Sequence, residues 1–151
     1  MVTAWRTTKR LYAPTAFSGL GARLDGGRWN AMGTPVVYLS SSRPLSVLEV
    51  LTQVRRASDL ADYVLIPATF DEADIETLDA LPPDWRALPA SDSTRRVGEQ
   101  WVAEARSLVL RVPSVVLPAE ANIVLNPAHP AAGRLQVGPA EALDIDPRLW
   151  G

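Results

Sequence analysis

Apolar residues along the chain occur in short runs, as expected for buried strands rather than long helices. Runs of four to eight residues bounded by turn signals and enriched in β-branched side chains are typical of strands. The strands predicted in this way, with the more polar opening segment included, lie at 4–9, 35–40, 62–70, 107–118 and 121–126. The segment 107–126 is predicted to contain two or three strands, and the tail 140–150 is predicted to add an edge strand. Residues 126–135 are predicted to form a loop with one helical turn.

Two segments carry the 3.6-residue period of an amphipathic helix. The first covers 45–57, with Ser42 as its cap and Pro44 in its first turn. At 100° per residue, one broad apolar face collects Val47, Leu48, Val50, Leu51 and Val54. Glu49 falls on the opposite face. A second, capped helix is predicted over 91–106, with Val97, Trp101 and Ala105 on one stripe.

Short strands combined with two helices indicate an α+β, or mixed α/β, fold. A chain of 151 residues is most simply one domain, 1–151, and is long enough to bury its own core. A doubly wound dinucleotide-binding fold would need regular strand–helix alternation and a glycine fingerprint after its first strand. The segment 19–27, "GLGARLDGG", has the wrong glycine spacing, so we reject that fold.

Composition excludes several kinds of site. The chain has no cysteine, so it has no disulfide, thiolate metal site or cysteine nucleophile. No run approaches the roughly 18 apolar residues of a membrane span, and the start "MVTAWRTTKR" lacks the apolar core of a signal peptide. We therefore expect a cytoplasmic protein with no membrane association.

The net charge of −2 conceals an uneven distribution. Residues 1–58 carry eight basic side chains against two acidic ones, whereas 59–151 carry seven against fifteen. A small anionic ligand would be drawn to the first third of the chain. A nucleic-acid-binding protein would usually be more basic overall.

Three residues within 25–51 exceed what a turn or a core requires. Arg28 follows Gly26 and Gly27, where a solvated hairpin arginine and a bidentate phosphate ligand are both open interpretations. Tyr38 lies in a buried strand as a core residue or at the rim of a pocket. Glu49 is either a solvated surface residue or part of a polar helix face, with Gln53, that lines a cleft.

Ser114 and His129 are two further candidates for chemistry. Ser114 lies between two apolar pairs, where its hydroxyl bonds to backbone or enters the same cleft. His129 is the single histidine, and no second histidine or acid at ligand spacing supports a metal, so we predict a loop residue and no metal site. A serine-hydrolase triad through His129 lacks a nucleophile-elbow motif.

Four segments together resemble the RES-domain family, the toxins of bacterial RES–Xre toxin–antitoxin pairs. They are "GGRWNAMGTPVVYLS" (26–40), "PLSVLEVL" (44–51), "VGEQW" (97–101) and "VPSVVLPAEANIVLNPAHP" (112–130). The resemblance extends from Trp5 and Arg6 to the final strand. Family helices commonly place an alanine near the positions held here by Ser46 and Val47, which leaves Glu49 in register.

The resemblance implies a split central sheet flanked by helices, as in ADP-ribosyltransferase toxins, and an activity that consumes NAD⁺. The family's named arginine, glutamate and serine match Arg28, Glu49 and Ser114, and its active-site tyrosine matches Tyr38. The catalytic set implied is thus Glu49, Arg28 and Tyr38. It also implies substrate-binding roles for Arg28, Tyr38, Ser114, Arg6 and Asn126, the last from the segment "NIVLNP" that borders the cleft.

The function implied is cleavage of NAD⁺ at the nicotinamide–ribose bond by hydrolysis, phosphorolysis or ADP-ribosyl transfer, which depletes NAD⁺ and arrests growth. NAD⁺ is then the substrate, and no cofactor is implied. The partners implied are a cognate Xre-type helix-turn-helix antitoxin and, only through it, DNA. The assembly is left open between a homodimer and a toxin–antitoxin hetero-oligomer. Two other classes are weighed beside it, a ribonuclease-type toxin and a non-catalytic dinucleotide-binding module.

Overall fold

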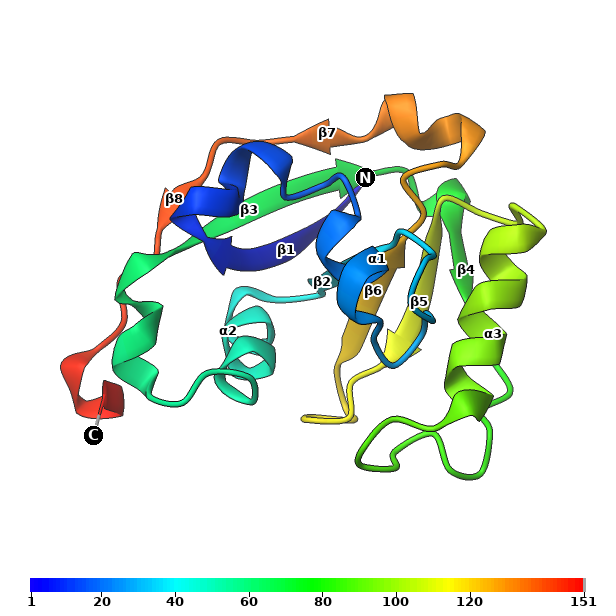
Figure 1. Cartoon of the computed structure of the whole chain (residues 1–151). Coiled ribbons are helices and arrows are strands. Elements are labelled where there is room, and N and C mark those ends of the chain that lie inside the picture. The colour runs from blue at the N-terminus through cyan, green and yellow to red at the C-terminus, as the bar shows by residue number, and fades with distance from the viewer. Residues whose placement is uncertain (151) are drawn as a thin grey trace.

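The computed structural model describes residues 1–150, which form eight strands and three α-helices beside them (Figure 1). The strands are β1 (Val2–Lys9), β2 (Val37–Ser40), β3 (Tyr63–Phe70), β4 (Ile75–Thr77), β5 (Val109–Pro113), β6 (Ala121–Leu125), β7 (Gln136–Val137) and β8 (Glu141–Ala142). The α-helices are α1 (Leu20–Asp25), α2 (Arg43–Leu51) and α3 (Asp92–Ala103). Short 3₁₀ helices are η1 (Arg10–Thr15), η2 (Ala57–Asp62), η3 (Glu72–Asp74), η4 (Pro130–Arg134) and η5 (Pro147–Trp150).

All eight strands belong to one mixed sheet, which confirms the predicted α+β class. The strand order is β4-β5-β6-β2-β1-β3-β7, and β8 pairs with β3 beyond this path. The pair β4–β5 is parallel, and the other pairs are antiparallel. The predicted tail strand is confirmed as the short β8. The segment 107–126 contains two strands. The acidic segment 71–81, to which no strand was assigned, contributes β4.

The sheet is split between β1 and β2. Those two strands pair at a single position, Trp5 opposite Ser40. In contrast, β1 pairs with β3 along its whole length, from Val2 opposite Phe70 to Lys9 opposite Tyr63. The strands therefore form two groups that diverge beyond Trp5, with α2 near one group and α3 beside the other in Figure 1.

Strand alternation places neighbouring residues of one strand in different hydrophobic clusters. On β6, Ile123 and Leu125 pack with Phe70 in one cluster. Val124, between them, faces the opposite side and packs with Trp101 of α3 in a second cluster. Side chains with the parity of Val124 thus face the side of the sheet that α3 covers.

Helix α2 begins as predicted but is shorter than predicted. The Ser42 hydroxyl accepts the Leu45 N–H at 3.2 Å, and the helix ends at Leu51 rather than at 57. At its C-terminal end the Thr52 hydroxyl donates to the Glu49 carbonyl at 2.7 Å. The chain then turns so that η2 can bury Leu60. The proposed apolar face is wrong, because the buried residues of α2 are Leu45 and Ser46.

Helix α3 ends at Ala103 instead of 106, and its buried stripe differs from the predicted one. Ser91 makes no side-chain capping bond. Ala105 is exposed and has a φ of 47°, so it lies in the turn after the helix. The buried positions are Thr94, Gly98 and Trp101.

Gly98 is required by the close approach of α3 to the loop that follows α1. A Cβ at Gly98 would lie 1.6 Å from the carbonyl oxygen of Trp29, a backbone atom that cannot move aside without shifting the loop. We predict that Gly98→Ala lowers the free energy of unfolding by about 1–3 kcal/mol or more, as for other overpacked sites. The measurement is urea-induced unfolding.

Gly133→Ala in η4 is the matched control. A Cβ there meets nothing within 4 Å, so its effect should stay within about 0.5 kcal/mol. Equal stability of the two variants would contradict the close approach.

Candidate active site

A cavity of about 1150 Å³ opens where the sheet splits. Its walls come from β1, β2, α2, the segment from η1 to the loop after α1, and the segment around Leu88 to Arg95. Four of the residues predicted from sequence, Arg6, Arg28, Tyr38 and Glu49, line it. The structure therefore brings together side chains that are up to 43 positions apart in the sequence.

Two consecutive glycines before Arg28 are required for different reasons. Gly26 has a φ of 71°, in the left-handed region that favours glycine. A Cβ at Gly27 would lie 2.7 Å from the Tyr38 hydroxyl oxygen. The two residues after Arg28 are both buried, Trp29 to 2% exposure and Asn30 to 0%. Gly27 and Asn30 close a tight turn, in which the Gly27 N–H donates to the Asn30 carbonyl at 3.0 Å, so the turn itself is present. Arg28 is half-buried on this structured loop, and the interpretation as a solvated arginine is wrong.

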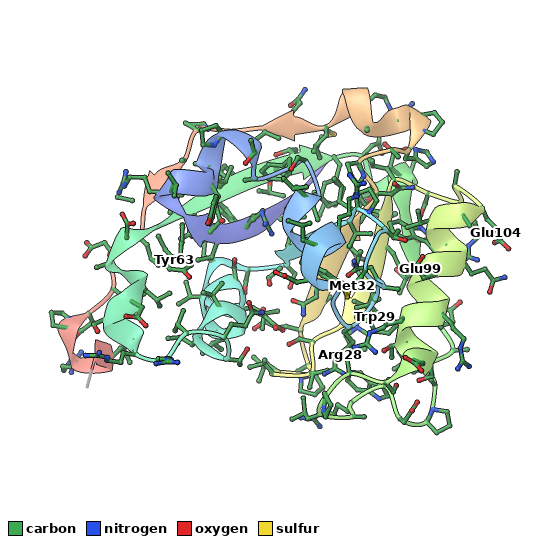
Figure 2. The ribbon with its side chains drawn as sticks, viewed as in Figure 1. Arg28, Trp29, Met32, Tyr63, Glu99 and Glu104 are labelled. Atoms are coloured by element: carbon green, nitrogen blue, oxygen red, sulfur yellow. The ribbon has the colours of Figure 1, made fainter. Side chains whose placement is uncertain are left out.

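Asn30 and Glu99 hold this loop by hydrogen bonds to its backbone. The Asn30 Nδ2 donates to the carbonyls of Ala22 and Thr34 at 2.8 and 3.0 Å. From α3, the Glu99 carboxylate accepts the Ala31 N–H and the Thr34 hydroxyl, each at 2.6 Å. Figure 2 shows Arg28 and Trp29 on the loop and Glu99 on the neighbouring α3. The segment "VGEQW" therefore supports the loop, with Gly98 providing the space and Glu99 the acceptors.

The Arg28 guanidinium uses one nitrogen to fix its position. Its Nη1 donates to the carbonyls of Trp85 and Ala87 at 2.9 and 2.8 Å. Burial lowers the pKa of Arg28, while the charge of Glu49 acts in the opposite direction. Every hydrogen bond that Arg28 donates within residues 1–150 uses Nη1, which leaves Nη2 and Nε for a ligand.

A second cation beside Arg28 was missed in the sequence. Arg95 lines the cavity, and its Nε donates to the Gly27 carbonyl at 3.3 Å. Its charge contributes to lowering the pKa of Arg28. Arg95 lies one helical turn before Glu99 on α3. The signal that could have found it is this spacing, which places both residues on the face toward the loop.

The Tyr38 hydroxyl is fully used within the protein. It donates to Asn30 Oδ1 at 2.6 Å and accepts the Trp29 N–H at 3.0 Å. Burial raises the pKa of Tyr38. The hydroxyl therefore fixes the loop, and what Tyr38 offers the cavity is its ring.

Glu49 points into the cavity rather than into solvent. Its Oε1 accepts two hydrogen bonds, from Ser114 Oγ at 2.7 Å and from Asn122 Nδ2 at 2.6 Å. Ser46 and Gln53 line the same cavity. The interpretation in which this polar face of α2 lines a cleft is confirmed, and the solvated alternative is wrong.

Ser114 and Asn126 do not line the cavity. Ser114 is fully buried behind Glu49. Asn126 follows β6 at the end away from Asn122, and its Oδ1 accepts the Ala128 N–H at 3.0 Å. The structure does not bring Asn126 to the other predicted residues. Asn122, the first asparagine of "NIVLNP", lines the cavity instead.

Arg6 forms the floor of the cavity at the split. Its Nη1 donates to the Tyr38 carbonyl at 3.0 Å, a group that β1 leaves without a strand partner on this side. Burial lowers the pKa of Arg6. Its Nε is buried and has no hydrogen-bond partner within residues 1–150. Arg6 thus presents a partly unsatisfied cation to the cavity.

The remaining titratable candidate, His129, serves the fold. Its Nδ1 accepts the Ala131 N–H at 2.9 Å, and its Nε2 lies 3.1 Å from the Ala105 carbonyl oxygen. In the described part of the chain, no three acidic or histidine side chains cluster closely enough to hold a metal ion. Likewise, no helix between residues 1 and 150 has the length and apolar character of a membrane span.

Comparisons with known proteins agree on one family. The family model for the RES domain matches residues 3–146. The Toxin Res of Photorhabdus laumondii is 42% identical over 125 residues, which cover 82% of this chain and 80% of the relative. The Prs ADP-ribosylating toxin of Sphingobium sp. is 37% identical and covers 96% and 94% of the two chains. The NAD(+) phosphorylase MbcT of Mycobacterium tuberculosis is 30% identical and covers 89% and 78%.

A solved structure shares the fold. A chain of the crystal structure of the M. tuberculosis MbcT–MbcA toxin–antitoxin complex superposes with a TM-score of 0.77 and 21% identity. The superposition covers 99% of this chain and 86% of that one. The likeness shows that this chain shares the mixed α/β fold of that chain.

Tyr38→Phe tests the structural role of the hydroxyl. Removal of a buried group that makes two hydrogen bonds should lower the free energy of unfolding at neutral pH by about 1–3 kcal/mol. Because burial raises the pKa of Tyr38, the stabilisation is complete below the unfolded pKa of about 10 and declines as the pH rises above it. The difference in the free energy of unfolding between wild type and Tyr38→Phe should therefore narrow by about 1.4 kcal/mol per pH unit above 10.

The measurement is urea unfolding of both proteins at pH 7 and at pH 11. Tyr12 and Tyr63 remain in both proteins, so the difference isolates Tyr38. If the difference in the free energy of unfolding is the same at pH 7 and pH 11, the structural role of the Tyr38 hydroxyl is contradicted.

Proposed function

Because the chain belongs to the RES domain family, we propose that it is the toxin of a bacterial toxin–antitoxin pair and cleaves NAD⁺ at the nicotinamide–ribose bond. One observation carries the proposal. The Glu49 carboxylate is held by hydrogen bonds from Ser114 and Asn122 within a cavity that Arg28 also lines. Relatives named as an ADP-ribosylating toxin and as an NAD(+) phosphorylase support the same chemistry.

The carboxylate suits the transition state of this reaction. As nicotinamide departs before the nucleophile is fully bonded, positive charge develops on the ribose as in an oxocarbenium ion. A fixed carboxylate stabilises that charge and orients the incoming nucleophile, because it needs no reorganisation during the reaction. We assign this role to Glu49, because both of its hydrogen-bond donors within residues 1–150 use Oε1 and leave Oε2 available.

The cations suit the pyrophosphate of the dinucleotide. Arg28 lines the cavity with Nη2 and Nε uncommitted, and Arg95 lies beside it. A guanidinium can bind two phosphate oxygens at once, which fixes the dinucleotide as well as neutralising it. We propose that Arg28 and Arg95 bind the pyrophosphate, and that Arg6 adds positive charge at the floor of the same cavity. The Tyr38 ring provides a flat surface for the nicotinamide.

The proposal includes three acceptors for the ADP-ribose group: water, phosphate and a protein side chain. One carboxylate can orient any of them. The relatives named as an ADP-ribosylating toxin and as a phosphorylase represent two of these outcomes. Product analysis after incubation with NAD⁺, in phosphate and in phosphate-free buffer, distinguishes phosphorolysis from hydrolysis.

The proposed partner is a cognate Xre-type helix-turn-helix antitoxin, through which the pair would reach DNA. The support is the structural neighbour, which belongs to a toxin–antitoxin complex. We place the toxin in the cytoplasm, where NAD⁺ is available, either as a homodimer or bound to its antitoxin in a hetero-oligomer. NAD⁺ is the substrate, and the proposal includes no separate cofactor.

Glu49→Gln tests the chemical role of the carboxylate. The change removes the charge and keeps an oxygen that can accept from Ser114 and Asn122, so the fold should remain. Turnover should fall about a hundredfold or more, because an electrostatic contact of about 2.7–4 kcal/mol in the transition state is lost. NAD⁺ binding should persist through Arg28 and Arg95. The measurement is nicotinamide release and NAD⁺ affinity on a variant that melts near the wild-type temperature.

Full activity of folded Glu49→Gln would contradict the mechanism. If the wild-type protein releases no nicotinamide from NAD⁺, the function itself is wrong, and the ribonuclease and binding-module alternatives become the ones to test.

The biological role has its own test. Expression of the chain alone should arrest growth and lower cellular NAD⁺, and coexpression of the cognate antitoxin should restore both. Growth and NAD⁺ are measured in the same cultures, with Glu49→Gln as the inactive control. Arrest without any fall in NAD⁺ would contradict depletion as the cause.

A further inference from the structure

Glu49 is held from one side only, by two donors that converge on the same oxygen. Ser114 Oγ and Asn122 Nδ2 both donate to Oε1, at 2.7 and 2.6 Å. Within residues 1–150 no hydrogen bond engages Oε2. A carboxylate bonded through one oxygen has its plane and its free oxygen fixed together, so the donors determine where Oε2 points.

The orientation of Asn122 is itself determined by a third side chain. Ser40 Oγ donates to Asn122 Oδ1 at 2.9 Å, so the amide must turn its Nδ2 toward Glu49. The register of the sheet places these two residues opposite each other, since Ser40 pairs with Asn122 between β2 and β6. Ser40 is buried, with 3% exposure. Ser40 is also the residue through which β2 pairs with β1, at the point where the sheet splits.

Ser114 is oriented in the same manner by backbone. Its Oγ accepts the Leu117 N–H at 3.0 Å, which directs the hydroxyl proton to Glu49. Ser114 is 0% exposed, whereas its neighbours Pro113 and Val115 line the cavity. A substrate in the cavity meets Glu49 before it could meet the Ser114 hydroxyl.

We propose that Ser40 and Asn122 are positioning residues for NAD⁺ cleavage, and that Ser114 acts with them through Glu49 rather than on the substrate. In this hydrogen-bond network Ser40 orients Asn122. Asn122 and Ser114 then hold Oε1 of Glu49, so that its Oε2 faces the ribose. The inference rests on the proposed function. It differs from the role that the family resemblance implies for Ser114, which is direct binding of the substrate.

The two roles for Ser114 predict different kinetics. A residue that contacts bound substrate in the ground state affects KM when it is removed. A residue that only orients the carboxylate affects the step in which charge develops, so kcat falls while KM is nearly unchanged. In addition, its effect should disappear when the carboxylate charge is already absent, because residues that act as one unit are not additive.

The experiment is nicotinamide release from NAD⁺ by the full-length protein with Ser40→Ala, Asn122→Ala and Ser114→Ala, each alone and combined with Glu49→Gln. We expect each single variant to lower kcat about tenfold or more, as for other misplaced catalytic groups, with KM within about twofold of wild type. In the Glu49→Gln background the same changes should alter the residual rate by less than about twofold. Ser40→Thr, which keeps the hydroxyl on a strand position suited to a β-branched side chain, should restore most of the kcat lost in Ser40→Ala.

Ser107→Ala is the matched control for loss of a half-buried, doubly hydrogen-bonded hydroxyl outside the cavity. Ser107 accepts from Trp101 Nε1 at 2.8 Å and donates to the Val109 carbonyl at 2.8 Å, outside the cavity. Its kcat and KM should both remain near the wild-type values. If Asn122→Ala fails to fold, the comparison of Ser40→Ala with Ser40→Thr still tests the inference.

Three results would overturn the inference while leaving NAD⁺ cleavage intact. They are a rise in KM without a fall in kcat for Ser114→Ala, effects that add fully to Glu49→Gln, and unchanged kinetics in folded Ser40→Ala and Asn122→Ala. Absence of nicotinamide release by the wild-type protein would instead overturn the proposed function, and the inference would fall with it.

Discussion

The single point of pairing between β1 and β2 is the constraint on which the rest of the site depends. Beyond Trp5 and Ser40 the two strands separate, so the sheet leaves an opening in its middle instead of a continuous floor. A buried backbone carbonyl without a strand partner is costly, and the Arg6 guanidinium satisfies the one on Tyr38. The same side chain therefore closes the split and gives the cavity its cationic floor.

The opening would be of little use without rigid walls, and these come from segments distant in sequence. Helix α3 approaches the loop after α1 so closely that only glycine fits at position 98. Glu99 then accepts hydrogen bonds from that loop, and Tyr38 holds it from the opposite side. A loop that is fixed before the ligand arrives binds with less entropic cost, which suits a cation that must meet a pyrophosphate.

Charge is arranged around the cavity as the sequence distribution indicated, with one difference. The basic first third supplies Arg6 and Arg28, and the carboxylate of Glu49 lines the same cavity. The acidic second part of the chain contributes Arg95, a cation that the bulk count conceals. Local placement by a helix therefore matters more for the site than the net charge of the region.

The sequence by itself determined the fold class, most strands and the cap of α2, whereas the roles of Arg28, Tyr38 and Glu49 were implied only by the resemblance to the RES-domain family. The fold class, strands and cap follow from local periodicity, turn chemistry and residue type, all of which are encoded within a few neighbouring positions. Only the tertiary structure decided that Glu49 faces the cavity, that Asn122 lines it rather than Asn126, and that Ser114 lies behind the carboxylate. Helical projection divides α2 into an apolar and a polar face but does not reveal that a second segment covers the polar one. That choice depends on contacts between residues 65 and 73 positions apart, whose formation is decided by strand register and packing rather than by local sequence.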